Sequence, residues 1–271
     1  MRLKERFPLA EKLVYFDNAV MGCAPQSTLE TIKKYTDALV EHMSGEREWT
    51  FNVEEGRGAK EEARELFAKV IGAEKEEVLG VPNASTAMNI AMSMLPVEKG
   101  DNIVSTDLAF PMGAALVQKT VERGAEARWL PSDNGVVEAE AFEKAINDDT
   151  AIVYIDQPSW FNGYMFDIDS IGEIAHDHGA YFVVDTTQSM GAIDWRIDET
   201  SVDFAGTSTF KWLLGGIPAA SAGFLYMKKE YIDEYSPAYV SGCTYDYEQK
   251  GVNGQYMEHE FKLNKGIKKY E

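Results

Sequence analysis

Short apolar runs alternate along most of the chain with longer stretches in which apolar residues recur every three or four positions. The first pattern is typical of buried β-strands, and the second is typical of helices with one buried face. The apolar runs predict strands at Val78–Val81, Asn102–Thr106, Ala127–Leu130, Ala151–Ile155, Tyr181–Val184, Asp203–Gly206 and Ala222–Met227. The periodic stretches predict helices at Gln26–Met43, Gly56–Ile71, Ser85–Leu95, Pro111–Arg123, Glu138–Asn147 and Ile168–His178.

This order of strands and helices predicts an α/β fold. Continuous apolar strands separated by helices form mainly parallel sheets that are covered by helices on both faces. Sheets of this kind bind ligands at the carboxyl ends of their strands. We therefore expect functional side chains just after the ends of the predicted strands.

The composition of the chain changes after about Ser236. Residues 237–271 contain few aliphatic side chains, many charges and several tyrosines, and no pair of secondary-structure elements is recognisable in them. We expect either an extended surface arm or the beginning of a second domain. The sequence is accordingly divided into an N-terminal segment (1–25), a large domain (26–235) and the start of a C-terminal region (236–271).

The 271 residues include 45 acidic and 26 basic side chains, which gives a formal net charge of −19. A negative field of this size repels phosphate backbones, so general nucleic-acid binding is not expected. The longest apolar runs, such as Ala151–Ile155, are too short to cross a bilayer, and the N-terminus lacks the apolar segment of a secretory signal. We expect a soluble, cytoplasmic protein with no membrane partner.

The sequence predicts no metal site. Cys23 and Cys243 lie far apart, and neither belongs to a CxxC pair. His176 and His178 are two positions apart in a predicted helix, where side chains at that spacing face different directions.

Two of the predicted strands are followed by ionisable side chains. Asp185 follows the run Tyr181–Val184, where it either lies at the rim of the sheet or caps the next turn. Lys211 follows a run of small hydroxyl residues and lies between Phe210 and Trp212. Aromatic neighbours favour partial burial of a lysine, and desolvation lowers the pKa of an amine towards nucleophilic competence.

Hydroxyl and aromatic side chains lie near other predicted strand ends. Ser85 and Thr86 open a helix directly after a strand, where free N–H groups favour an anion, although the same residue types are ordinary helix caps. Ser208 adds a hydroxyl shortly before Lys211. Phe110 follows another strand and is either a core residue or an aromatic plate at the rim.

An amine, an acid, an aromatic plate and an anion site together match the requirements of pyridoxal phosphate. This cofactor needs a lysine for a Schiff base, a carboxylate for its pyridinium nitrogen, an aromatic side chain against its ring and a phosphate cup. The protonated ring then accepts electrons from a carbanion at the α-carbon of the substrate. A Rossmann dehydrogenase is excluded, because Gly56-Arg57-Gly58 lacks the third glycine and does not follow a strand.

Four ordered motifs carry a resemblance to a known family. They are Tyr15-Phe16-Asp17-Asn18-Ala19, Asp107–Met112 (DLAFPM), Asp185–Ser189 (DTTQS) and Lys211. The chain resembles the class V aminotransferase family of fold type I pyridoxal-phosphate enzymes, which includes cysteine desulfurases, kynureninases and isopenicillin-epimerase-like proteins. The resemblance extends to about Tyr231. It implies a fold type I large domain, an amino-acid substrate and a homodimer.

The resemblance also implies a role for each matching residue. Lys211 would form the Schiff base and later move the α-proton, and Asp185 would pair with the pyridinium nitrogen. Gln188 would hydrogen-bond the phenolic oxygen, and Phe110 would stack on the ring. The phosphate would be held by Ser85, Thr86 and Ser208.

The sequence departs from the family pattern at several positions. Trp160 occupies the expected position of an asparagine near the ring oxygen, and Asn162 is the alternative for that role. Phe210 stands where desulfurases carry a histidine that contacts the phosphate. Ala109 replaces the glutamate of the E-F-P triplet.

The end of the chain differs from the family pattern as well. Tyr270-Glu271 resembles the start of the family's [YF]-E-x-G-T element. Family members continue into a small C-terminal domain that supplies the substrate-binding arginine and, in desulfurases, a nucleophilic cysteine. Neither Cys23 nor Cys243 matches that cysteine. We therefore expect a truncated chain in which the small domain is largely absent.

The leading hypothesis is a pyridoxal-phosphate enzyme of the aminotransferase type, acting on an amino acid through Lys211. A cysteine desulfurase or selenocysteine lyase is the first alternative. A truncated, non-catalytic remnant of the fold is the second. The retained Asp185, Gln188 and Lys211 favour a catalytic ancestry.

Overall fold

The protein is described by a computed structural model that covers residues 3–45, 53–216, 222–241, 243–246 and 262–271. Its centre is a seven-stranded sheet with the strand order β1-β7-β6-β5-β4-β2-β3. The strands are β1 (Val78–Val81), β2 (Asn102–Thr106), β3 (Glu126–Leu130), β4 (Thr150–Asp156), β5 (Tyr181–Asp185), β6 (Phe204–Ser208) and β7 (Gly223–Met227). From β3 to β6 all neighbours are parallel, whereas β7 is antiparallel to both β6 and β1. The predicted, mainly parallel α/β sheet is confirmed.

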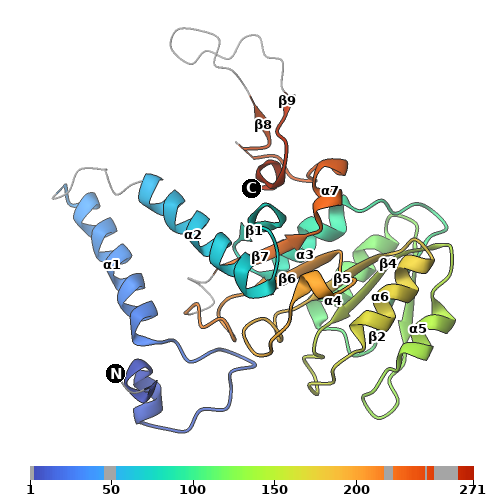
Figure 1. Ribbon diagram of the computed structural model, residues 1–271, viewed down its shortest axis with the longest axis horizontal. Helices are drawn as coiled ribbons and strands as arrows, with labels where there is room; N and C mark the ends of the chain where they lie inside the picture. Colours follow the sequence, from blue (N-terminus) through green and yellow to red (C-terminus); the bar gives the residue numbers. More distant parts are fainter. Residues whose placement is uncertain (1–2, 46–52, 217–221, 242, 247–261) are drawn as a thin grey trace.

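Helices cover both faces of this sheet (Figure 1). They are α2 (Val53–Ile71), α3 (Ala84–Met94), α4 (Pro111–Val121), α5 (Ala139–Ala145), α6 (Ile168–Asp177) and α7 (Lys229–Glu234), whereas α1 (Gln26–Met43) lies to one side of the sheet. One core lies under α3, α4 and α7, and the other lies under α2, α5 and α6. Successive strand residues alternate between the two cores, so in β4 Ile152 and Tyr154 face α3 and α4 while Val153 and Ile155 face the opposite side. Burial on both faces explains why these strands are continuously apolar in the sequence.

The predicted boundaries of the main strands and helices agree with the structure to within a few residues. For example, α2 begins at Val53 rather than Gly56, and β5 includes Asp185. Helix α7 was not predicted, because its six residues are too few to show helical periodicity. None of the helices in the described parts of the chain is long and apolar enough to cross a membrane.

Of the two alternatives for the residues after 236, an extended surface arm does not describe the residues that the structure covers. Strands β8 (Tyr245–Asp246) and β9 (Lys262–Leu263) form an antiparallel pair, and Ile267 and Tyr270 are buried in the core under α3. The Tyr270 hydroxyl donates to the carbonyl oxygens of Ile232 and Tyr235, at 3.0 and 2.6 Å. Because Tyr270 supplies much of this contact, the low aliphatic content of residues 237–271 did not indicate that they pack against the large domain.

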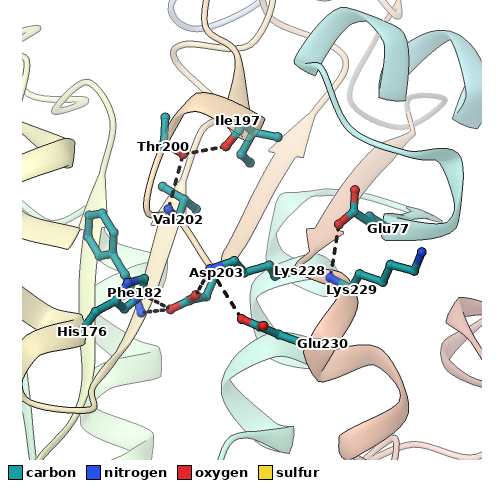
Figure 2. Close-up of polar contacts among 10 residues, drawn as sticks. All are labelled: Glu77, His176, Phe182, Ile197, Thr200, Val202, Asp203, Lys228, Lys229 and Glu230. Carbon is teal, nitrogen blue, oxygen red and sulfur yellow. Dashed lines mark hydrogen bonds and ion pairs between the residues drawn. The ribbon is translucent and has the colours of Figure 1, made fainter. Parts of the chain in front are cut away.

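A buried ionic cluster ties the sheet together at the edge opposite the carboxyl ends of the parallel strands (Figure 2). Asp203, which is 0% exposed, immediately precedes β6. Its Oδ2 accepts from the backbone N–H of Phe182 at 2.8 Å and lies 2.9 Å from Nε2 of His176. Its Oδ1 lies 3.6 Å from Nζ of Lys228. One carboxylate thus joins β5, α6, β6 and the start of α7.

Replacing Asp203 by alanine is expected to lower the free energy of unfolding by about 2 kcal/mol, because the buried N–H of Phe182 loses its acceptor. The loss stays below the ~3–5 kcal/mol typical of a broken buried pair, since His176 and Lys228 are each about one third exposed and turn to water. Urea denaturation measures the change. Asp148→Ala is the matched control: Asp148 pairs with His178 but its side chain is 93% exposed, so we expect a loss within about 0.5 kcal/mol. Equal losses in the two variants would contradict this assignment.

Candidate active site

Three neighbouring parallel strands end in polar side chains on the same face of the sheet. Asp156 ends β4, Asp185 ends β5 and Ser208 ends β6. Asp156 and Asp185 are direct partners in the parallel register. Each of the three is an even number of residues from a core residue under α3 and α4, and side chains alternate along a strand. All three therefore project on the side of the sheet that carries α3 and α4.

A cavity of about 310 Å³ lies at this edge. Six of the seven site residues predicted from the sequence line it, namely Ser85, Phe110, Asp185, Gln188, Ser208 and Lys211. They come from elements that are far apart in the chain, and the parallel sheet brings them together. The seventh, Thr86, does not line this cavity.

Lys211 lies in the turn that follows β6. Its Nζ is 6.0 Å from the ring centroids of both Phe110 and Phe210. Burial lowers the pKa of the Lys211 amine, while the negative charges of Asp185 and Asp156 act in the opposite direction. An amine with a lowered pKa is more often unprotonated at neutral pH, and the unprotonated form is the nucleophile.

Asp185 is the acid predicted from the sequence, and it is only 6% exposed. Its Oδ1 accepts from the backbone N–H of Thr187 at 2.9 Å. Burial raises the pKa of Asp185, whereas the bond from the Thr187 N–H and the charge of Lys211 lower it. The bond from Thr187 thus fixes the Asp185 carboxyl group at the end of β5, and Lys211 lines the same cavity.

The N-terminus of α3 lines one end of the cavity. Ser208 accepts from the backbone N–H of Ala84 through Oγ at 2.8 Å, which ties the end of β6 to the first turn of α3. Asn83 caps the helix and accepts from both the N–H and the hydroxyl of Thr86, at 2.9 and 3.2 Å. Thr86 instead lines a second cavity of about 560 Å³ on the other side of Ser85, which lines both. Ser85 and Ser208 are therefore the hydroxyl residues that line the predicted site.

Aromatic side chains and Gln188 complete the wall. The rings of Phe110 and Trp160 meet edge to face, with centroids 5.4 Å apart. Gln188 donates to the carbonyl oxygen of Ala19 at 3.0 Å and accepts from the indole N–H of Trp212 at 2.8 Å. The N-terminal segment and the residue after Lys211 thus fix the orientation of the Gln188 amide.

Trp160 and Asn162 were alternatives for one position in the sequence, and the structure separates them. Trp160 lines the cavity. Asn162 is exposed, donates to the carbonyl oxygen of Gly135 at 2.7 Å and accepts from the N–H of Tyr164 at 3.0 Å. Its amide holds a surface turn and does not line the cavity.

Asp156 is a cavity residue that the sequence reading missed. It is 5% exposed, and its Oδ2 accepts from the backbone N–H of Phe110. The signal was present in the sequence, because Asp156 ends the apolar run Ala151–Ile155 just as Asp185 ends Tyr181–Val184. Two strand-end acids, and not one, therefore face Lys211.

The residues around this cavity fit pyridoxal phosphate. An amine stands opposite buried acids, an aromatic ring lies beside the amine, and a helix N-terminus with two serines offers N–H and O–H groups to an anion. Buried polar atoms also remain without a hydrogen-bond partner among the described residues, among them Oδ1 of Asp156 and Oγ1 of Thr187. Such atoms call for a ligand or water partner.

Comparisons with known proteins agree with this fit. The profile of the family described as Aminotransferase class-V matches residues 14–266. An uncharacterised aminotransferase of Bacillus subtilis is 30% identical over 255 residues, which cover 94% of this chain and 65% of that protein. A probable cysteine desulfurase of Methanothermobacter thermautotrophicus is 30% identical over 253 residues, covering 89% of this chain and 60% of that protein. The chain thus spans less than two thirds of the length of these relatives.

Solved structures show the same fold. The apo cysteine desulfurase of Thermococcus onnurineus has a TM-score of 0.81 at 25% identity, covering 100% of this chain and 66% of that one. A C-DES mutant with glycine covalently linked to its PLP cofactor has a TM-score of 0.82 at 21% identity, covering 100% and 69%, and supports the fold alone. The chain belongs to the class-V aminotransferase family, whose cofactor is pyridoxal 5′-phosphate.

Proposed function

We propose that this chain carries the cofactor site of a pyridoxal-phosphate enzyme that acts on an amino acid, with Lys211 as the lysine that binds the cofactor aldehyde. The observation that carries the proposal is the position of the Lys211 amine: it lies in one cavity with two buried acids and beside the ring of Phe110. A surface lysine has neither feature. When bound, the cofactor supplies an acceptor for the electrons released at the substrate α-carbon.

The other residues of the site hold and orient the cofactor. Asp185 keeps the pyridinium nitrogen protonated by remaining ionised next to it, and its bond from Thr187 stabilises the ionised form. Ser85 and Ser208 bind the phosphate together with the N–H groups of the first turn of α3. Phe110 packs against the ring, and Gln188 faces the phenolic oxygen. Thr86 would contact the phosphate only if its hydroxyl gave up its hydrogen bond to Asn83.

Lys211 also moves the proton. With a substrate bound in the cavity, the unprotonated Nζ of Lys211 would act as the base that takes the proton from the substrate α-carbon. Its lowered pKa suits this task, because a base works best when its pKa lies near the working pH.

A cysteine desulfurase-like reaction is the second candidate, and the names of the relatives favour it. Within the described residues, the cavity lining contains neither Cys23 nor Cys243. The complete reaction, the division of the chain at residues 26–235 and 236–271, and the homodimer are all parts of this proposal.

Incubation with pyridoxal phosphate followed by borohydride reduction tests the proposal. Peptide mass spectrometry is expected to find the reduced cofactor on Lys211. Adding L-cysteine or L-alanine before borohydride reduction then separates the candidates. Alanine, with sulfide released by an added dithiol reductant, supports desulfuration, and a pyridoxamine product with a keto acid supports amino transfer. A chain that takes up no cofactor would support the non-catalytic remnant instead.

A further inference from the structure

Asp156 is held at the end of β4 in an unusual environment. Its Oδ2 is occupied by the N–H of Phe110, the residue before α4, while its Oδ1 has no hydrogen-bond partner among the described residues. The side chain is buried, lines the cavity and is register-paired with Asp185 on β5. None of the sequence motifs gave it a role.

The charges around Asp156 disfavour the state in which Asp156 and Asp185 are both ionised. Asp185 faces it from β5 and Lys211 from the turn after β6, so two carboxyl groups share one amine. The two residues are direct partners on adjacent parallel strands, and a like charge that faces a buried carboxyl group favours the uptake of a proton. The remaining neighbours are neutral: the N–H of Phe110, which donates to Oδ2, and the Tyr154 hydroxyl on β4, which has no hydrogen-bond partner among the described residues.

Two observations favour Asp156 over Asp185 as the carrier of this proton. Burial raises the pKa of Asp156 well above its usual range, and the negative charge of Asp185 raises it further, against the smaller effects of Phe110, Tyr154 and Lys211. Oδ1 of Asp156 is buried without a hydrogen-bond partner among the described residues, whereas Oδ1 of Asp185 accepts from the N–H of Thr187, and this bond and the charge of Lys211 lower the pKa of Asp185. The pair then consists of one carboxylic acid and one carboxylate.

We propose that Asp156 is a second acid of the cofactor site, that it keeps its proton at neutral pH, and that it donates this proton in a hydrogen bond to an anionic oxygen of the bound ligand. This role rests on the function proposed above. A buried O–H group without an acceptor is costly, and a ligand in the cavity that Asp156 lines removes this cost. The acceptor is either the phenolate oxygen of the cofactor or the carboxylate of the amino acid.

The neutral acid has a consequence for Lys211. An ionised Asp156 would raise the pKa of the Lys211 amine. A protonated Asp156 leaves Lys211 facing the single negative charge of Asp185, so the amine stays closer to its nucleophilic form. Asp156 thus contacts the ligand and also tunes the lysine.

Infrared spectroscopy of the protein without cofactor tests the protonation directly. We expect a carbonyl stretching band of a protonated carboxylic acid at neutral pH, its loss in Asp156→Asn, and its retention in the control Asp148→Asn at an exposed aspartate. A wild-type spectrum without this band, or a band unchanged in Asp156→Asn, would overturn the proposal. This measurement does not depend on whether the chain binds pyridoxal phosphate.

Adding ligands to the same samples identifies the acceptor. A shift of the band on binding pyridoxal phosphate assigns the phenolate oxygen, and a shift only after addition of an amino acid assigns its carboxylate. A band that responds to neither ligand but shifts in Tyr154→Phe would show that Tyr154 is the acceptor, and this would overturn the donor role. Absence of cofactor binding with the band intact would refute the proposed function and the donor role, but not the protonation of Asp156.

Cofactor affinity provides the second measurement. Asp156→Asn keeps both an acceptor for Phe110 and an N–H donor, so we expect its dissociation constant for pyridoxal phosphate to lie within about threefold of the wild-type value. Asp156→Ala removes the donor and is expected to weaken binding roughly tenfold or more if the phenolate is the acceptor. Equal weakening in both variants would mean that a carboxylate is required, which contradicts a neutral acid.

Discussion

Replacing Lys211 by alanine is expected to abolish the covalent attachment of pyridoxal phosphate to the chain. The Schiff base requires a primary amine, and among the described residues Lys211 is the lysine that lines the cavity beside the two acids. After borohydride reduction, mass spectrometry should find no cofactor on the variant, and its visible absorbance should not change. Residual binding through Ser85, Ser208 and the helix N-terminus is expected to be weak and reversible by dialysis.

The control for this experiment is Lys119→Ala. The Lys119 side chain is 72% exposed on α4 and pairs with Glu122, so its removal leaves the cavity untouched. We expect a reduced cofactor adduct in the Lys119→Ala variant and no adduct in the Lys211→Ala variant. A reduced adduct that persists in Lys211→Ala at the wild-type level would place the reactive lysine elsewhere and contradict the proposed function.

Much of the sheet could be predicted because each central strand is buried on both faces. The runs Ala151–Ile155 and Tyr181–Val184 are apolar without interruption, and each coincides with a strand to within a residue at either end. The parallel order then required that residues after these strands meet at one edge. For this reason the sequence alone could predict that Asp185, Ser208 and Lys211 lie in one site.

The parts that could not be predicted depend on packing between distant segments. Ser85 and Thr86 are adjacent hydroxyl residues, and the sequence predicts both equally as phosphate ligands. Only the orientation of α3 and the hydrogen bond from the Thr86 hydroxyl to Asn83 turn Thr86 away from the cavity. The two alternatives for the tail stayed open because its anchoring residues, Ile267 and Tyr270, lie among charged residues in the sequence. Asp156 is different: its position after an apolar run was as informative as that of Asp185, and no motif drew attention to it.

The N-terminal segment shows the same limit most clearly. Its Tyr15–Ala19 stretch matched a family motif, but the sequence did not reveal what the segment contacts. In the structure the carbonyl oxygen of Ala19 accepts from Gln188, and the N–H of Gly22 donates to the carbonyl oxygen of Phe210 at 2.8 Å. The segment therefore packs against the turn that presents Lys211.

Replacing Gly22 by alanine is expected to slow the capture of pyridoxal phosphate by Lys211 roughly 10²-fold, because a displacement of about 1 Å in a reacting group has an effect of this size. A Cβ at Gly22 would overlap the backbone carbonyl oxygen of Lys211, and a backbone atom cannot move aside as a flexible side chain does. Either the N-terminal segment or the lysine turn must shift. Stopped-flow absorbance with added cofactor measures the capture rate.

Gly58→Ala is the matched control, since Gly58 is exposed in α2 and a Cβ there meets nothing within 4 Å. This substitution is expected to leave the capture rate unchanged and to stabilise the helix by about 1 kcal/mol. Circular dichroism should show the same sheet and helix content in both variants, because Gly22 lies outside the two cores. Equal capture rates in the two variants would mean that the N-terminal segment does not hold the turn of Lys211, whereas a slow Gly22→Ala beside a normal Gly58→Ala would make this segment part of the cofactor site.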